Sequence, residues 1–451
     1  MPTNMPIRPT PEEIDVLLNR NEDERLYNRL MLLHPADIAE LLDDLLPEVA
    51  VAVFNLLPVA VASEVLDETR SRVRAELVDK IDDEVLADLL DDLPMDDAAE
   101  FLEDLPPEIA EKLLSLMEPG EAQEVQRLLS YDEDTAGRLM TQDVVVVRRH
   151  WTVNETLNHL RNLKDMETFY YLYVVDRHYH LVGVVPLRRL LMATPLQKLD
   201  KLVLSDVSTV LATADQEELA EMVSKYDYFA IPVVEPGGRF LGVVTVDDVL
   251  DIVAEETTED IQKLGGSSPL DQPYFALTTM QLVRKRIVWL LFLFGTSILT
   301  DSVINAFDYV LVAVGSLKLF MPVITGTGGN AGSQTVTTII RAMAVGEIRM
   351  SDLGRTLRRE MAVGLMMGVI LAMFGFVRAA IFNIQWEVAL VLSLTLPVVV
   401  VWATTVATVV PIVVERYKID PTVVSAPVIT TLIDASGLFI YFSLAKWILN
   451  I

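Results

Sequence analysis

The stretch YLYVVDRHYHLVGVVPLRRLL, residues 171–191, decides the fold in the middle of the chain because a second copy of it follows. That copy is AIPVVEPGGRFLGVVTVDDVL, residues 230–250, in which Gly242 corresponds to Gly183. Each copy predicts a strand, a turn, a second strand and a helix. A further helix is predicted before each copy, around residues 153–163 and 215–225. We expect the two units to pack face to face as one α/β module.

The repeat divides the front of the chain into domains of two kinds. It is similar to tandem CBS domains, regulatory modules that often bind nucleotides or ions, and implies one CBS domain at residues 137–200 and a second at 201–257. Residues 1–136 instead contain Leu- and Ala-rich segments separated by Asp-Leu-Pro breaks, as in LADLLDDLPMDDAAEFLEDLPPEIAEKLL. This pattern predicts an acidic, all-α helical-repeat N-domain whose short helices begin at Pro or at an acidic cap.

The second copy continues into VTVDDVLDIVAEETTEDIQKLGG, which predicts one connecting helix that ends at Gly265 and, over residues 247–266, overlaps the end of the second CBS domain. Its carboxylates at i,i+4 spacing are Asp247, Asp251, Glu255 and Glu259 in one row, and Glu256 and Asp260 in a second pair. Like charges at this spacing destabilise a helix by a few tenths of a kcal/mol each. A solvated face is one explanation, but the row has no interleaved Lys, so bound divalent cations explain it better. Oxygen ligands favour Mg²⁺ or Ca²⁺.

Charge is distributed unevenly along the 451 residues. Residues 1–280 contain 56 Asp and Glu against 23 Lys and Arg, a balance of −33, whereas residues 281–451 contain 9 against 13, a balance of +4. The acidic front half would repel nucleic acid, so cations are the favoured small partners. The absence of Cys excludes disulfides and thiolate metal sites. The start of the chain shows no secretory signal, so we expect the first 280 residues to stay in the cytoplasm.

The back half contains apolar stretches long enough to cross a bilayer, which needs about 20 residues. We predict a five-helix transmembrane domain at residues 270–451. Its spans are expected at about 287–307, 319–342, 361–382, 388–414 and 422–449. Lys and Arg in the flanks number ten on one side and three on the other, which places the N-terminus in the cytoplasm and the C-terminus outside.

The second span contains TGTGGNAGSQTVTT, residues 325–338, with four glycines around Asn330. Such glycines allow close helix packing in a bundle, or they form an unwound segment that lines a wet cavity. Packing requires small residues but not the many hydroxyl and amide oxygens of this stretch. A polar lining is therefore favoured over packing alone.

The last span contains one carboxylate, Asp434, within TTLIDASGLFIY, residues 430–441. Asp420 and Pro421 predict the N-cap and the first residue of the helix, which puts Asp434 about 20 Å further along, near mid-bilayer. A charge there costs ~2.5–3.5 kcal/mol, so Asp434 is a functional candidate. A protonated Asp that hydrogen-bonds to a neighbouring helix is the alternative. A second carboxylate, Asp301, lies near the outer end of the first span. The sequence does not decide between a functional and a structural role for it.

Three segments together resemble MgtE magnesium transporters, and the resemblance covers nearly the whole chain. They are PVITGTGGNAGSQ in the second span, the acidic connecting helix, and LIDASG in the last span. The resemblance implies a homodimeric Mg²⁺-selective channel for magnesium uptake in the cell (inner) membrane, with a pore lined by the second and fifth spans. Asp434 would hold a largely hydrated Mg²⁺, since this ion dehydrates reluctantly. The implied pore and selectivity residues are Asp434, Asn330, Gly328, Gly329 and Thr338.

The same resemblance implies that cytosolic Mg²⁺ closes the channel by binding carboxylates of the N-domain, the second CBS domain and the connecting, or plug, helix. Bound ions would relieve repulsion among these acids and compact the cytoplasmic half. The implied ligands are Glu64, Asp96 and Glu100 in the N-domain, Asp215, Asp227, Asp247, Asp248 and Asp251 in the second CBS copy, Glu256, Glu259 and Asp260 on the plug helix, and Asp420 beside the membrane.

The chain departs from the family pattern at several positions. The family often has Asn where this chain has Ser333 and Ala426, which bears on selectivity among divalent cations. It also often has Asp after Arg188, where this chain has Arg189, so the ribose of ATP would lack a carboxylate partner there. Thr245 and the acids that follow it in the second copy could hold a ribose, although we expect cations at these acids. ATP therefore stays open as a second ligand besides transported and regulatory Mg²⁺.

Other classes of protein fit the sequence less well. A channel or transporter for Co²⁺, Mn²⁺ or Ca²⁺ is the nearest alternative. An anion channel with CBS domains is disfavoured because an intramembrane Asp repels anions. A membrane-anchored regulatory protein would have no use for Asp434. An enzyme is disfavoured because the sequence shows no nucleophile–base pair and no GxxxxGK[ST] phosphate loop.

Overall fold

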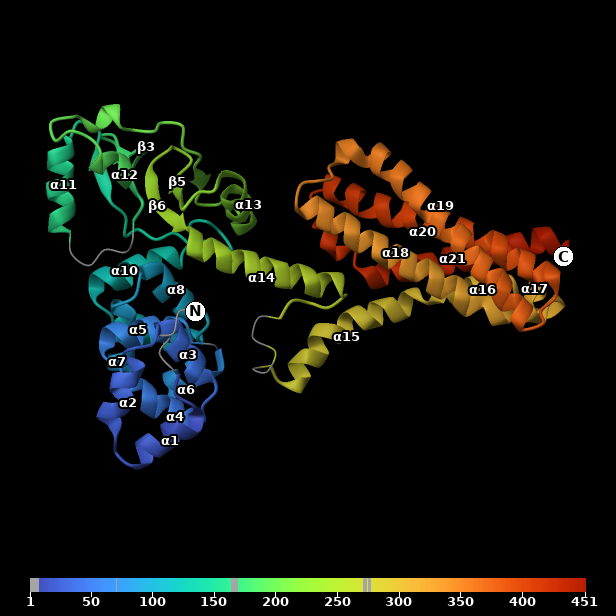
Figure 1. Cartoon of the computed structure of the whole chain (residues 1–451), viewed down its shortest axis with the longest axis horizontal. Coiled ribbons are helices and arrows are strands. Elements are labelled where there is room, and N and C mark those ends of the chain that lie inside the picture. The colour runs from blue at the N-terminus through green and yellow to red at the C-terminus, as the bar shows by residue number, and fades with distance from the viewer. Residues whose placement is uncertain (1–7, 70, 164–168, 271–273, 275–276) are drawn as a thin grey trace, which may run out of the picture. The chain divides into compact units, whose positions relative to one another are not determined.

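The computed structural model describes residues 8–69, 71–163, 169–270, 274 and 277–451. Residues 1–7, on which part of the expectation about a secretory signal rests, lie outside the described residues. The chain divides into two compact units, Met1–Glu256 and Thr257–Ile451. Figure 1 shows the helices and strands of both units with their labels.

The first unit begins with a series of short helices, which confirms the all-α helical-repeat N-domain. They are α1 (Pro11–Asn19), α2 (Asp23–Leu30), α3 (Pro35–Asp43), α4 (Pro47–Phe54), α5 (Val59–Asp67), α6 (Ser71–Lys80), α7 (Asp83–Asp91), α8 (Met95–Glu103), α9 (Pro107–Leu116) and α10 (Pro119–Leu128). Pro is the first residue of α3, α4, α9 and α10 and the N-cap of α5 and α8. Pro is tolerated at the start of a helix because the first backbone N–H groups have no partner within the helix.

Each copy of the internal repeat forms a three-stranded sheet, as predicted. The first sheet contains β1 (Val146–Arg148), β2 (Tyr171–Val175) and β3 (Leu181–Pro186), and the second contains β4 (Val210–Leu211), β5 (Ala230–Val234) and β6 (Phe240–Thr245). In both sheets the first strand is parallel to the second, and the second is antiparallel to the third. The helices that precede and follow the hairpins are α11 (Val153–Asn162), α12 (Leu187–Leu191), α13 (Gln216–Tyr226) and α14 (Val246–Leu264).

The two CBS copies pack on each other and on the N-domain. Tyr173 of the first sheet stacks on Phe240 of the second, with ring centroids 5.1 Å apart. Arg138, which is 7% exposed, donates from its Nε to Glu103 of α8 over 3.0 Å. One apolar core extends from the N-domain helices to Leu219 of α13 and Ile252 of α14. The N-domain and the second CBS copy therefore form one packed body (Figure 1).

The repeated glycines allow a neighbouring backbone to approach the third strand of each sheet. A Cβ on Gly242 would lie 2.3 Å from the carbonyl oxygen of Thr141, and a Cβ on Gly183 would lie 2.1 Å from that of Leu204. Both distances are far below van der Waals contact. A backbone carbonyl group cannot move aside as a flexible side chain can. This explains why a glycine occurs at the corresponding position of both copies.

We predict that Gly242→Ala destabilises the second CBS copy by ~1–3 kcal/mol, because the added methyl group overlaps the Thr141 carbonyl. Hydrogen exchange of β5 and β6 in the full chain would measure the loss of protection. Gly237→Ala is the matched control, since its Cβ would meet nothing within 4 Å. Equal protection in both variants would contradict this explanation.

The second unit is a bundle of long helices that follow the predicted spans within several residues. They are α15 (Thr279–Thr296) continued by α16 (Ile298–Ala306), α18 (Met321–Ala344), α19 (Leu353–Ile381), α20 (Trp386–Arg416) and α21 (Ala426–Leu449), with short α17 (Asp308–Ala313) after α16. Short 3₁₀ turns span Gly315–Phe320, Met350–Asp352 and Pro421–Val423 in this unit, and a further one spans Leu199–Lys201 in the first.

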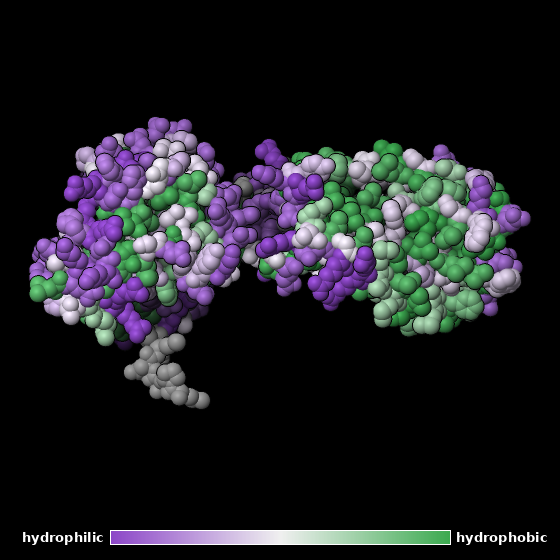
Figure 2. Space-filling model, turned by 90° about the horizontal axis from the view of Figure 1, so that it is seen from above, coloured by the Kyte–Doolittle hydropathy of each residue, from purple (hydrophilic) through white to green (hydrophobic). Residues whose placement is uncertain are grey.

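Four segments within the described residues are long and apolar enough to span a membrane: Thr279–Ala306, Met350–Ile381, Trp386–Arg416 and Ala426–Leu449. The polar helix α18 is not among them, although its 24 residues equal those of α21. Hydrophobic residues cover much of this unit's surface on the face that Figure 2 shows. That α18 is a fifth membrane span therefore stays a prediction.

Two details of the predicted membrane domain are wrong. α18 is a continuous helix rather than an unwound segment. The last helix begins at Ala426 and not at Pro421, because Asp420 caps only the 3₁₀ turn and Pro427 lacks the N–H that a continuous helix would need at that point. Asp434 consequently lies about 12 Å beyond the start of its helix instead of about 20 Å.

Candidate cation sites

The acidic connecting helix forms as predicted, and α14 carries all six carboxylates of the two predicted i,i+4 sets. Asp248 has a local role as well. Its Oδ2 accepts hydrogen bonds from the backbone N–H of Thr245 over 3.2 Å and from the Thr245 hydroxyl over 2.6 Å. Burial raises the pKa of Asp248 to about 6, despite these hydrogen bonds. Ionisation of this carboxylate at the start of α14 is therefore less favourable than in water.

Carboxylates of the N-domain face those of α14 across the packed interface of the first unit. Burial raises the pKa of Asp67, at the end of α5, to about 6, and the negative charges of Glu68 and Asp251 contribute. Glu100 on α8 keeps part of its side chain exposed, yet burial by the surrounding protein, followed by repulsion from Asp67 and Glu255, raises its pKa to about 7. Acids from three helices thus destabilise one another's ionised forms.

A cavity of about 760 Å³ lies between the N-domain and the CBS pair within the first unit. Its acidic lining comprises Glu64, Asp96 and Asp97 from the N-domain, Asp143 from the segment before β1, and Asp247 and Asp248 from α14. Its aromatic lining includes Tyr170 and Phe229, whose rings stack with centroids 4.8 Å apart. The cavity is large enough for hydrated cations or for a nucleotide.

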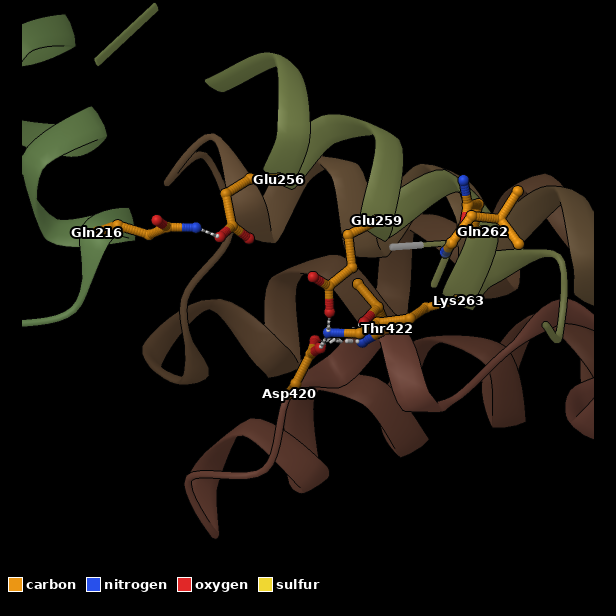
Figure 3. A network of polar contacts seen from close by, with 8 residues as sticks. Gln216, Glu256, Glu259, Gln262, Lys263, Asp420 and Thr422 are labelled. Carbon is orange, nitrogen blue, oxygen red and sulfur yellow. Dashed lines mark hydrogen bonds and ion pairs between the residues drawn. The ribbon is translucent and has the colours of Figure 1, made fainter. Parts of the chain in front are cut away.

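Three other predicted ligands, two in the second CBS copy and one on the plug helix, have contacts or conformations with structural roles. Asp215 is the N-cap of α13 and accepts from the Glu217 backbone N–H over 2.9 Å. Asp227 ends the same helix in the left-handed conformation, with φ of 55°. The Gln216 side chain donates to Glu256 over 2.5 Å (Figure 3). These roles do not exclude metal binding, which stays a prediction for all three acids.

The last turns of α14 belong to the second unit, where they contact the 3₁₀ turn before α21 (Figure 3). The Lys263 ammonium pairs with Glu259 one turn earlier and lies 2.9 Å from Oδ2 of Asp420. Asp420 also accepts from the backbone N–H and the hydroxyl of Thr422, over 2.8 and 2.6 Å. These interactions lower the pKa of Asp420, although burial opposes them. Two predicted Mg²⁺ ligands, Glu259 and Asp420, therefore lie around one lysine.

Within the second unit, α18 packs closely on α21 through its glycines. A Cβ on Gly328 or Gly332 would lie 2.9 or 2.2 Å from atoms of Ile433, and a Cβ on Gly329 would lie 2.7 Å from Thr430. The glycines therefore serve close helix packing, one of the two roles expected of them, and the polar lining stays a prediction. The polar side chains contribute separately, because the hydroxyl groups of Ser333 and Thr430 hydrogen-bond across the two helices over 2.9 Å.

Asp434 lies on the face of α21 that contacts α18. A Cβ on Gly329 would be 3.6 Å from its Oδ1, and this oxygen is buried without a hydrogen-bond partner. The alternative explanation is a protonated Asp434 that hydrogen-bonds to a neighbouring helix. Within the described chain, Oδ1 of Asp434 makes no such hydrogen bond. Asn330 and Thr338 lie on the exposed face of α18, so one chain alone does not bring them into the same buried contact.

The carboxylates fit hydrated ions better than a compact all-protein cage. Among the residues that the structure describes, no group of three or more His, Asp or Glu side chains is gathered closely enough to hold a bare metal ion. Mg²⁺ usually keeps several waters and binds through one or two carboxylates. Two sets of acids match that mode of binding. One consists of the N-domain acids near α14, and the other is the pair formed by Glu259 and Asp420.

Two residues of these sites were missed from the sequence. No local pattern predicts Asp67 as a site residue, because Asp251 is distant from it in the chain. The packing of α5 near α14 brings the two carboxylates together. Lys263 was overlooked because the acidic row was followed no further than Glu259. Continuing the i,i+4 spacing by one step would have reached it.

The raised pKa values predict that acid substitutes in part for cations. In a chelator, lowering the pH from 7.5 to 5.5 protonates Asp67 and Glu100, since their pKa values in the packed state are about 6 and 7. The packing is fully stabilised below the ordinary carboxyl pKa and weakens as the pH rises through these raised values. We expect hydrogen-exchange protection of α8 to increase by about tenfold at the lower pH.

Glu100→Gln should reduce this pH dependence and raise protection at pH 7.5. Glu108→Gln, at an exposed position of α9, is the control and should behave as the unmodified chain does. Protection that is the same at both pH values would show that these carboxylates do not oppose the packing.

The geometry describes a membrane protein with an acidic first unit and a helical bundle. Residues 321–444 match the family model of MgtE, a divalent cation transporter, and residues 33–134 match that of the MgtE intracellular N domain. Residues 136–195 and 200–255 match the CBS domain. The class is therefore that of divalent cation transporters that contain CBS domains.

Proteins similar to this chain specify the family. The magnesium transporter MgtE of Thermus thermophilus is 40% identical over 332 residues, which cover 72% of this chain and 73% of that protein. That of Bacillus subtilis is 33% identical over 326 residues, covering 71% of each. A crystal structure of the cytosolic domain of the Mg²⁺ channel MgtE in complex with ATP is 38% identical, with a TM-score of 0.51, and covers 53% of this chain and 98% of that one. The chain belongs to the MgtE family of magnesium transporters.

Proposed function

We propose that this protein is a Mg²⁺-selective channel for magnesium uptake that cytosolic Mg²⁺ closes. The relatives named as magnesium transporters support Mg²⁺ as the transported ion and do not favour Co²⁺, Mn²⁺ or Ca²⁺. The observation that carries the proposal is Asp434, whose buried Oδ1 has no hydrogen-bond partner on a helix long and apolar enough to span a membrane. An unpaired carboxylate at such a place is explained by an ion that binds there transiently.

The pore would form between two copies of the chain, with α18 and α21 on its axis. The exposed face of α18 carries Asn330, Gln334 and Thr338. Exposed polar residues on a spanning helix require water or a partner. A homodimer in which these faces line a wet path satisfies them and brings two copies of Asp434 near one hydrated ion. The excess of Lys and Arg on one side of the spans supports a cytoplasmic first unit in a protein of the cell membrane.

Closure would follow from the acids of the first unit. Asp67 lies near Asp251 and Glu100 near Glu255 of α14, and burial keeps their ionised forms unfavourable although the Arg74 guanidinium offsets part of the repulsion. Mg²⁺ that binds among these acids stabilises the packed form over the separated one, and a ligand shifts an equilibrium by its difference in affinity for the two states. The packed form would hold α14 in the position that shuts the pore.

ATP is a second proposed ligand of the first unit. The stacked rings of Tyr170 and Phe229 line the cavity together with Thr245 and Asp247, which offers aromatic and polar contacts to an adenine nucleotide. The similar cytosolic domain was crystallised with ATP. Arg189 donates to the Leu202 carbonyl over 3.1 Å, so this arginine is engaged where the family often has Asp.

Transport by purified protein in liposomes tests the proposed function. Asp434→Asn removes the charge at constant size, and we expect Mg²⁺ flux to fall by about tenfold or more, since the ion loses its only carboxylate at that depth. Asp308→Asn, at an exposed position in the first turn of α17, is the control and should leave flux unchanged. Full flux in Asp434→Asn would refute the role assigned to this residue.

A further inference from the structure

Lys263 occupies the place of a cation between two carboxylates from distant parts of the chain (Figure 3). Its ammonium group contacts Glu259 on α14 and Asp420 before α21, so it joins α14 to that turn through charge. Because both carboxylate oxygens lie within hydrogen-bonding distance of one nitrogen, the gap between them accommodates one cation. A lysine ammonium and a divalent ion cannot share it.

The surroundings fix the Asp420 carboxylate more firmly than the Lys263 ammonium group. Asp420 is held by the backbone N–H and hydroxyl of Thr422, over 2.8 and 2.6 Å. Lys263 instead reaches the gap on a flexible four-carbon stem, and its side chain is 28% exposed. Asp420 therefore keeps its place when the lysine leaves, and water can reach the gap. An ion that enters meets the fixed carboxylate of Asp420 and the carboxylate of Glu259.

The charges determine which cation stabilises the contact better. Lys263 leaves the pair of acids with one uncompensated negative charge, whereas Mg²⁺ compensates both. At low Mg²⁺ the tethered ammonium has the advantage of being always present, since it lies one turn from Glu259 in the favourable Glu-to-Lys order. At high Mg²⁺ the ion displaces it. The lysine therefore raises the Mg²⁺ concentration that this contact needs.

We propose that Lys263 is a built-in competitor of Mg²⁺ at Glu259 and Asp420. At low Mg²⁺ it tethers the end of α14 to the turn at Pro421–Val423, and it sets a threshold below which Mg²⁺ does not bind there. This inference rests on the proposed Mg²⁺ regulation. It adds Lys263 as a positioning residue that holds the end of α14 and sets the Mg²⁺ concentration at which the ion binds there. The lysine contacts neither the transported ion nor the pore helix residues around Asp434.

Hydrogen exchange of residues 257–264 and 417–425, measured in the purified full chain over a Mg²⁺ titration, tests the proposal. Lys263→Met keeps the length of the stem and removes its charge. We expect lower protection without Mg²⁺, because the tether is lost. We also expect half-maximal protection at a Mg²⁺ concentration about three- to tenfold lower, because the competitor is lost. A lysine with only a structural role would lower the protection without lowering that concentration.

Two further variants make the result decisive. Lys263→Arg retains the charge and should resemble the unmodified chain in both measurements. Lys225→Met, which removes a surface lysine that lies over the Tyr226 ring, should also change neither. A midpoint for Lys263→Met that equals or exceeds that of the unmodified chain overturns the proposal. If Mg²⁺ protects no variant, including the unmodified chain, the proposed Mg²⁺ regulation itself fails.

Discussion

Excess negative charge along α14 is the constraint on which the arrangement of this protein depends. The helix carries seven carboxylates, and its N-terminal turns pack near Asp67 and Glu100 of the N-domain. Apolar contacts that extend from the N-domain to Ile252 favour the packed form, whereas the acids oppose it. The balance is therefore sensitive to any cation that reaches them, which is the physical basis of a sensor.

The helix bundle solves a different problem, since it has to bring a polar stretch and a carboxylate into an apolar protein. Glycines on α18 let its backbone approach Ile433 and Thr430 of α21 more closely than any larger residue permits. That approach leaves Oδ1 of Asp434 buried and unpaired. Hydrogen bonds such as that between Ser333 and Thr430 satisfy the neighbouring oxygens within the protein. The bundle thus pairs these hydroxyl groups and leaves the carboxylate of Asp434 available.

The sequence predicted the features that depend on local spacing. The repeat around Gly183 and Gly242 specified both sheets, and Pro at helix starts specified the N-domain. The start of α21 was mispredicted because Asp420-Pro421 has the form of a helix N-terminus, while Pro427 a few residues later imposes the real one. The unwinding expected of α18 does not occur, because its glycines face a packed neighbour. Lys263 and Asp67 depend on contacts between distant segments, which no local pattern specifies.

The central claim is that divalent cations hold the N-domain against α14. The chain contains no Cys, so spin labels can be attached to cysteines introduced at two exposed positions, Val85 of α7 and Val253 of α14. The distance between the labels, measured by electron paramagnetic resonance in full-length protein, should form one narrow distribution in millimolar Mg²⁺. Removal of Mg²⁺ with a chelator should give a broader distribution at longer distances. The same narrow distribution under both conditions would contradict the account.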